Sequence, residues 1–166
     1  MLVVDAADGP SEQDARLGGL IEENGRAVVV ALNKSDLLGG PGAAKEVMNK
    51  LADEVGFLKY APSQLVSAVR GDGVLDLMDR VKEVREQHEK RISTADINKF
   101  YAEVCETHPP PVQSGRAVRI SYVTQATSKP PTFLVFCNHP KYLAESYKRY
   151  LVNQLRKRYG FKGTPI

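Results

Sequence analysis

Short apolar runs alternate with stretches of helical periodicity along the first half of the chain. Residues 2–4, 27–32 and 63–68 predict strands, and the second run is apolar on both faces, as parallel strands between helix layers are. Apolar residues recur at helical spacing from the capping residue Ser11 to Asn24, over 43–55 and over 74–90. This order of strands and helices predicts right-handed crossovers and a parallel sheet.

The pattern changes after residue 90. Ser93 or Thr94 is placed to cap a helix, and the apolar face of this helix is formed by Ile97, Phe100, Tyr101 and Val104. Residues 116–125 and 131–138 predict the two strands of a hairpin with a loose loop. Residues 141–160 predict a helix that ends at Gly160, and 161–166 are expected to begin one more strand.

Charge divides the chain at the same place. Residues 1–90 contain 11 Lys/Arg and 16 Asp/Glu, a net charge of −5, whereas residues 91–166 contain 12 and 4, a net charge of +8. We therefore predict two parts, 1–90 and 91–166, of which the second faces a polyanion. The alternative is a basic face that is only solvated.

Composition limits the classes of protein. The chain has 166 residues, 42% of them hydrophobic and 26% charged, as in globular proteins. Its longest apolar run, 27–32, is far shorter than the roughly 20 residues that span a bilayer, so no membrane partner is expected. Cys105 and Cys137 are too few for a disulfide framework, which favours a reducing compartment, the cytosol or a matrix.

The strand at 27–32 ends in Asn33-Lys34-Ser35-Asp36, the Asn-Lys-x-Asp pattern by which GTPases recognise guanine, and the next strand ends in Ser67-Ala68. A carboxylate at Asp36 can accept hydrogen bonds from guanine N1–H and N2–H, which adenine does not offer. Asn33 is expected to tie the loop to its neighbours and contact the base. The Lys34 stem would lie along one face of the base, and the Ala68 N–H would point at O6.

The phosphate side of such a site has no counterpart in this sequence. No G-x-x-x-x-G-K-[ST] motif occurs, and the similar segment 39–46, "GGPGAAKE", lacks the second glycine and the Ser/Thr that would hold magnesium. Four residues that could bind zinc (Cys105, His108, Cys137 and His139) have spacings unlike those of familiar structural sites, so no metal site is predicted.

Basic residues interleave with tyrosines near the end of the chain. This composition resembles that of an RNA-contact surface. The candidate RNA-contact residues are Lys148, Arg149, Arg156, Lys157 and Arg158. The two parts together carry no catalytic candidate, because no Ser or Cys nucleophile is paired with a His by any sequence signal.

These segments resemble a family. "LVVDAADGPSEQD", "ALNKSDLL", "VSAVRGDGV", "KRISTADINKF", "YVTQATSKPPTFLVFCNHP" and "SYKRYLVNQLRKRYGFKGTPI" are similar to the C-terminal portion of Der-type (EngA-type) GTPases, which have two tandem GTPase domains and a KH-like domain. The resemblance implies an α/β fold: a partial P-loop-GTPase-type parallel sheet over 1–90, with Asn33, Lys34, Asp36, Ser67 and Ala68 as guanine-binding residues. A small α+β KH-like domain over 91–166 follows, helix-strand-strand-helix-strand with the last strand incomplete.

The resemblance also implies GTP/GDP as ligand, magnesium only in the full-length parent, and a role in large ribosomal subunit assembly in the bacterial cytoplasm or an organellar matrix or stroma. The first GTPase domain, and the phosphate loop, switches and magnesium ligands of the second, have no counterpart here. We therefore expect a fragment that binds GTP or GDP weakly or not at all and does not hydrolyse GTP alone. Residues 2–4 would then form an exposed apolar edge where missing strands should pair.

Three interpretations stay open. The chain is a truncated ribosome-assembly GTPase, whose partners are the large ribosomal subunit or its RNA and the missing GTPase domains. Alternatively, it is a free-standing, non-enzymatic module that binds RNA or the ribosome, or a protein-interaction element that docks on a GTPase partner.

Overall fold

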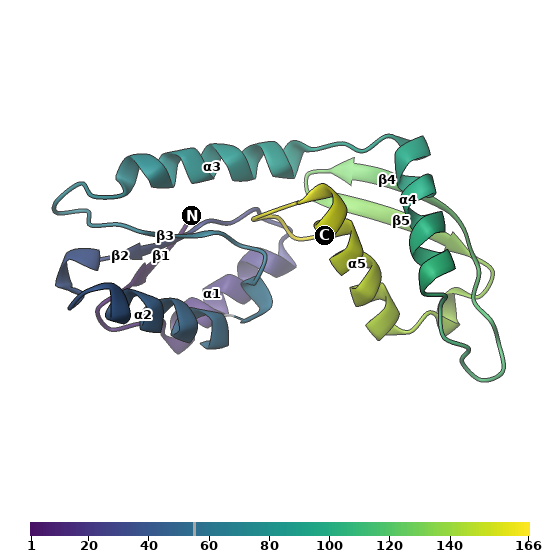
Figure 1. Ribbon diagram of the computed structural model, residues 1–166, viewed down its shortest axis with the longest axis horizontal. Coiled ribbons are helices and arrows are strands. Elements are labelled where there is room, and N and C mark those ends of the chain that lie inside the picture. Colours follow the sequence, from purple (N-terminus) through teal and green to yellow (C-terminus); the bar gives the residue numbers. More distant parts are fainter. Residues whose placement is uncertain (55) are drawn as a thin grey trace. The chain divides into compact units, whose positions relative to one another are not determined.

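The computed structural model describes residues 1–54 and 56–166, the side chains of 41 and 57 excepted. The chain forms two compact units. The first comprises Met1–His88 together with Phe161–Pro165, and the second comprises Glu89–Gly160 with Ile166. Figure 1 shows the elements of each unit.

The first unit is a parallel sheet with helices on both faces. Strands β1 (Leu2–Asp5), β2 (Val30–Asn33) and β3 (Ser63–Leu65) lie in the order β1-β2-β3. Helices α1 (Glu12–Glu23) and α2 (Pro41–Glu54) cover one face, and α3 (Val74–Glu89) covers the other (Figure 1). The parallel α/β prediction is confirmed, and residue 55, where the predicted second helix ends, lies outside the described residues.

The segment 28–32 explains why this unit has a core on each side of the sheet. Val28, Val30 and Leu32 pack on the α1 and α2 side, whereas Val29 and Ala31 pack on the α3 side. Successive side chains of a strand point to opposite faces, so an uninterrupted apolar run supplies both cores.

The first strand lies at one edge of the sheet. Within the described residues, β1 pairs with β2 alone. Leu2 and Val4 are buried, while Val3 is half exposed. Ser11 caps the first helix as predicted, and a capping box forms there: the Ser11 hydroxyl accepts from the Asp14 N–H, and the Asp14 carboxylate accepts from the Ser11 N–H.

The second unit packs two helices against an antiparallel strand pair. Ser93 caps helix α4 (Thr94–Thr107), strands β4 (Ile120–Ser128) and β5 (Pro131–Cys137) pair, and α5 (Glu145–Tyr159) follows. Strand β4 begins at Ile120, later than predicted, and continues to Ser128, while β5 ends at Cys137, one residue earlier than predicted. The predicted loose loop is therefore wrong: only Lys129-Pro130, joined by a cis peptide bond, form the turn. Helix α5 begins later than predicted, because Ala144 is extended and Pro140–Tyr142 form a separate 3₁₀ turn. Its buried apolar residues include Ile97, Phe100, Tyr101, Val104, Val118, Val123, Pro131, Tyr147, Leu151 and Leu155.

Two side-chain amides attach neighbouring segments to β4. The Asn98 amide on α4 accepts a hydrogen bond from the Val123 N–H at 2.9 Å and donates one to the Val123 carbonyl at 2.8 Å. Gln125 does the same for the chain before α4, accepting from the Ile92 N–H and donating to the Lys90 carbonyl. Each amide makes the two hydrogen bonds that the backbone of a neighbouring strand would make, and so satisfies a backbone N–H and a backbone carbonyl.

Residues 161–165, here called the C-terminal strap, differ from the prediction. The described residues 161–166 contain no strand, and the strap belongs to the first unit although the sequence division placed it with 91–166. The Gly163 carbonyl accepts from the Val28 N–H at 2.6 Å, and the Gly163 N–H donates to the Tyr60 carbonyl at 2.7 Å. Phe161 and Thr164 are fully buried. The backbone of the strap is hydrogen-bonded to the segments that precede β2 and β3. The local sequence pattern does not indicate these contacts.

Candidate nucleotide-base site

The loop after β2 carries the predicted base-recognition residues. Asn33 is the last residue of β2, Lys34 adopts a left-handed backbone conformation with φ 65°, and Ser35–Leu37 form a 3₁₀ turn. The Ser35 N–H donates to the Val66 carbonyl at 3.0 Å, which joins this turn to the end of β3. Because parallel strands end at the same edge of a sheet, the loops after β1, β2 and β3 meet there.

Asp36 and Ser67 are in direct contact, although 31 positions separate them. The Ser67 hydroxyl donates to Asp36 Oδ1 at 2.6 Å and accepts from the Arg70 N–H at 3.2 Å. This hydroxyl lowers the pKa of the Asp36 carboxyl below its ordinary value, with a smaller contribution from the positive charge of Arg70. Asp36 is therefore an oriented carboxylate at neutral pH, and fully buried Ser67 is the group that orients it.

Asn33 and Ala68 form the second contact between the two loops. The Ala68 N–H donates to Asn33 Oδ1 at 3.0 Å, so Asn33 does tie the loops together. The structure thus brings Asn33, Asp36, Ser67 and Ala68 into one cluster. The Ala68 N–H, expected to point at guanine O6, is directed at Asn33 here, and its contact with a base stays a prediction.

Lys34 makes a contact that the sequence interpretation missed. Its ammonium group lies 2.5 Å from Asp5 Oδ2, at the end of β1. This pairing lowers the pKa of Asp5 and raises that of Lys34. The strand register explains the contact: Asp5 is the register partner of Asn33, one residue before Lys34, and no local sequence signal indicates this pairing.

The segment that resembles a phosphate loop does not form one. Residues 41–46 are the first turns of α2, a helix that continues to Glu54. A phosphate loop wraps its backbone N–H groups around the anion, whereas these residues run along a helix. The sequence-based rejection of 39–46 agrees with this geometry.

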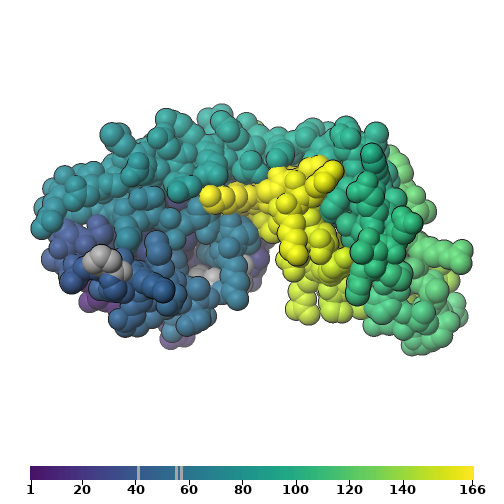
Figure 2. All heavy atoms as spheres, in the orientation of Figure 1, coloured from purple at the N-terminus to yellow at the C-terminus, as the bar shows by residue number. Residues whose placement is uncertain are grey.

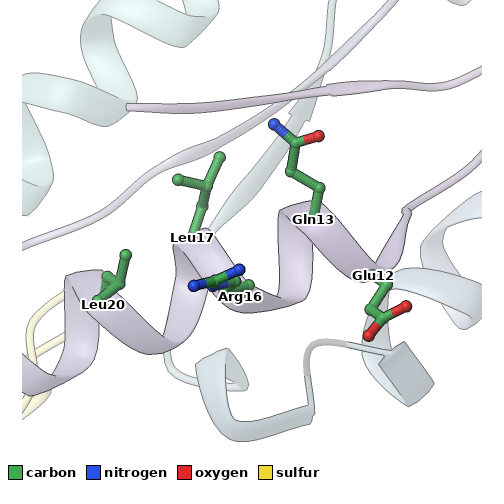
Figure 3. A pocket seen from close by; sticks show the side chains of 5 residues that line it. All are labelled: Glu12, Gln13, Arg16, Leu17 and Leu20. Atoms are coloured by element: carbon green, nitrogen blue, oxygen red, sulfur yellow. The ribbon is translucent and has the colours of Figure 1, made fainter.

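A broad hollow of about 520 Å³ lies along α1, and Figure 3 shows its lining. Among the described residues, the side chains that line it project from this one helix: Glu12, Gln13, Arg16, Leu17 and Leu20. Leu17 and Leu20 are more than 40% exposed. The hollow is an open, partly apolar helix face, and none of the predicted site residues lines it.

The candidate RNA-contact residues lie on α5 but do not share one face. At about 100° per residue, Lys148, Arg149 and Arg156 fall within an arc of about 100°, whereas Lys157 and Arg158 lie about 180° and about 280° from Lys148. Lys148 lines a hollow of about 370 Å³ beside β5 and is ion-paired with Glu145 at 2.6 Å. Lys157 and Arg158 line a second hollow, of about 320 Å³, between α4 and α5, which Figure 2 shows side by side.

The second hollow combines cations with aromatic surface. Its lining consists of Phe100, Glu103, Val104, Thr107, Tyr150, Gln154, Lys157 and Arg158.

The cysteines in this unit are free thiols, and the Tyr147 hydroxyl contacts Cys105 Sγ at 3.6 Å. Among the residues that the structure describes, no three His, Cys, Asp or Glu side chains are grouped as a metal site. None of the helices described here is long and apolar enough to cross a membrane.

Comparison with known proteins agrees with both units. A parallel sheet between helices, followed by a small α+β unit, is consistent with a P-loop GTPase domain joined to a KH-like domain. Residues 1–87 match the elongation factor Tu GTP-binding domain family, and residues 91–166 match the C-terminal KH-domain-like family of EngA bacterial GTPases. The chain belongs to the elongation factor Tu GTP-binding domain family, and it corresponds to the C-terminal portion of Der-type GTPases.

Individual relatives cover the whole chain. It is 39% identical to the GTPase Der of Natranaerobius thermophilus, 43% to that of Synechococcus sp. and 40% to that of Staphylococcus carnosus. All of this chain aligns in each case, but it spans only 37–38% of the length of these relatives.

Proposed function

We propose that this chain carries the guanine-recognition half of a GTP-binding site. The observation that supports this most is the cluster at the carboxyl edge of the sheet, where Asp36 is held by Ser67 and Asn33 is held by Ala68. Two contacts between loops more than 30 residues apart make a preformed cluster, which is what selective binding of one base requires.

The chemistry of the cluster fits guanine. The Asp36 carboxylate is ionised at neutral pH, and the Ser67 hydroxyl stabilises this charged form further and orients it. Ser67 uses one acceptor position of Oδ1, and a carboxylate has about four, so acceptors remain for the N1–H and N2–H of guanine. Adenine offers no donors at these positions and would leave the carboxylate without a partner.

Binding by this chain alone is proposed to be weak, and hydrolysis is not expected. No G-x-x-x-x-G-K-[ST] motif is present in its 166 residues, so the charge-assisted contacts to phosphates and the magnesium ligands have to come from elsewhere. We propose as their source the part of a Der-type GTPase that this chain does not span. The functional protein is then a GTPase of large ribosomal subunit assembly, in the bacterial cytoplasm or an organellar matrix or stroma.

The test of base recognition uses nucleosides, because they remove the phosphate contribution. Guanosine and adenosine are titrated into the ¹⁵N-labelled chain, and NMR shifts of residues 33–36 and 66–69 are followed. Selective shifts with guanosine support the proposal, whereas equal responses to the two nucleosides refute it. A GTPase assay on the same chain should show no turnover above background.

A ribosomal RNA contact by the second unit is the second proposal. It is supported by the net charge of +8 over 91–166 and by the hollow in which Lys157 and Arg158 lie beside Phe100 and Tyr150. Cations next to aromatic surface are suited to phosphates and unstacked bases. The alternative is a module that docks only on protein.

The RNA proposal is tested by charge neutralisation. Lys157→Gln with Arg158→Gln is compared with Lys148→Gln and Arg149→Gln, and the control is Lys45→Gln with Lys50→Gln on α2, which removes the same charge from the first unit. Binding to large-subunit ribosomal RNA is measured over a range of salt concentrations. Each lost phosphate contact should reduce the salt slope by about 0.7 to 0.9. If all three pairs change RNA binding equally, a defined RNA surface on α5 is refuted.

A further inference from the structure

The ion pair between Asp5 and Lys34 links two strand ends at the proposed base site. Asp5 closes β1, and its two carboxylate oxygens have separate partners. Oδ1 accepts from the N–H groups of Ala7 at 2.9 Å and Asp8 at 3.4 Å, while Oδ2 lies 2.5 Å from the Lys34 ammonium. The turn after β1 therefore holds the Asp5 side chain in one orientation, with Oδ2 directed at Lys34.

Lys34 is held at both ends. Its backbone is left-handed, and hydrogen bonds fix the residues on either side: the Ala6 N–H donates to the Asn33 carbonyl at 2.7 Å, and the Ser35 N–H donates to the Val66 carbonyl at 3.0 Å. Its ammonium group is held by Asp5. The aliphatic stem between these points therefore runs from the carboxyl end of β2 toward that of β1 and has lost much of the freedom of a lysine side chain.

We propose that Asp5 is a positioning residue of the base site, which acts by holding the Lys34 stem as a preformed apolar surface for the guanine ring. This inference rests on the proposed function. Asp5 contacts no nucleotide in this scheme. Its contribution is to order the long Lys34 side chain before the base binds, so that less conformational entropy is lost on binding.

The first part of the test asks whether the pair exists, independently of any ligand. The Asp5 carboxyl group is titrated by ¹³C NMR in the wild-type chain and in Lys34→Met, which keeps a linear apolar stem and removes the ammonium. A pKa that rises on substitution supports the pair. An Asp5 pKa that is the same in both proteins overturns the proposal.

The second part measures guanosine affinity by NMR titration. Asp5→Asn keeps the acceptor for the turn and removes the charge, and Asp8→Asn is the matched control because it removes the same charge from the same turn but leaves the pair. Asp5→Asn should weaken guanosine binding about two- to fivefold, the range of an exposed ion pair, and Asp8→Asn should have a smaller effect. Thermal unfolding of the three proteins should agree closely.

A double-variant cycle separates positioning from a general loss of structure. In the Lys34→Met background, Asp5→Asn should have no further effect on guanosine affinity, because the group that it positions is gone. If the two substitutions weaken binding independently, or if Asp5→Asn leaves binding unchanged, the positioning role is overturned. If the wild-type chain binds guanosine no better than adenosine, the proposed function fails and the positioning role fails with it, while the carboxyl titration still reports whether the pair exists.

Discussion

Replacement of Asp36 by Asn tests the central chemical claim about the site. Asn keeps the size of the side chain and one oxygen, which can still accept the hydroxyl of Ser67 now bonded at 2.6 Å. The loop after β2 should therefore keep its conformation. The second oxygen becomes an NH₂ group, which would face the N1–H and N2–H donors of guanine with a donor of its own.

The size of the effect follows from the charged hydrogen bonds that are lost. A hydrogen bond to an ionised group is among the stronger ones, and its loss corresponds to a decrease in guanosine affinity of about 10- to 100-fold. We expect the lower part of this range, because Asp36 is only partly buried and water competes for its oxygens. Xanthosine carries a carbonyl where guanosine has its amino group, so Asp36→Asn should shift the preference toward xanthosine.

The assay is an NMR titration of the 166-residue chain with guanosine, xanthosine and adenosine. Asp53→Asn is the control, because this substitution removes the same charge at an exposed position on α2. The control should retain wild-type selectivity. Base recognition by Asp36 is contradicted if Asp36→Asn binds guanosine as well as the wild type does while its spectra show an unchanged fold.

Three further substitutions test contacts within each of the two units. Ser67→Ala should raise the pKa of Asp36 toward its ordinary value of 3.8. Because the folded-state pKa is lowered, the stabilisation that Ser67 provides is present at neutral pH and decreases below about pH 4, and urea unfolding at pH 7 and pH 3 measures this difference. Gly163→Ala should destabilise the chain by about 2 to 4 kcal/mol, because the new Cβ would lie 2.4 Å from Val84 Cγ2 and the backbone φ is +70°. The control is Gly71→Ala, which has a φ of +81° and open space around its Cβ and should cost only about 1 kcal/mol in the same unfolding experiment. Asn98→Ala should cost about 2 kcal/mol, because the Val123 N–H and carbonyl lose their partners; amide hydrogen exchange at Val123 should accelerate, and unchanged exchange would contradict the role of Asn98.

Most of the secondary structure could be predicted from local sequence. The apolar run before Asn33 has no polar position on either face, so it had to be a strand buried between two helix layers, and Ser11 and Ser93 are caps whose side chains need only the next turn as partner. The Asn-Lys-x-Asp motif was visible for the same reason, since its residues are adjacent in the chain. Local periodicity also placed the α-helices, although it did not indicate the 3₁₀ turns Ser35–Leu37 and Pro140–Tyr142 or the later start of α5.

Only the tertiary structure showed which distant groups meet. The Ser67 hydroxyl on Asp36 and the Asp5 carboxylate on Lys34 depend on strands that end side by side, and the strap around Gly163 depends on the segments before β2 and β3 lying side by side. The hollows that Lys148, Lys157 and Arg158 line on α5 likewise depend on the elements packed beside that helix. Periodicity reports the environment of a residue along its own element, but a hydrogen bond or an ion pair depends on distances of about 3 Å between elements. Those distances are set by strand register and packing, and therefore the partners became identifiable only in the folded chain.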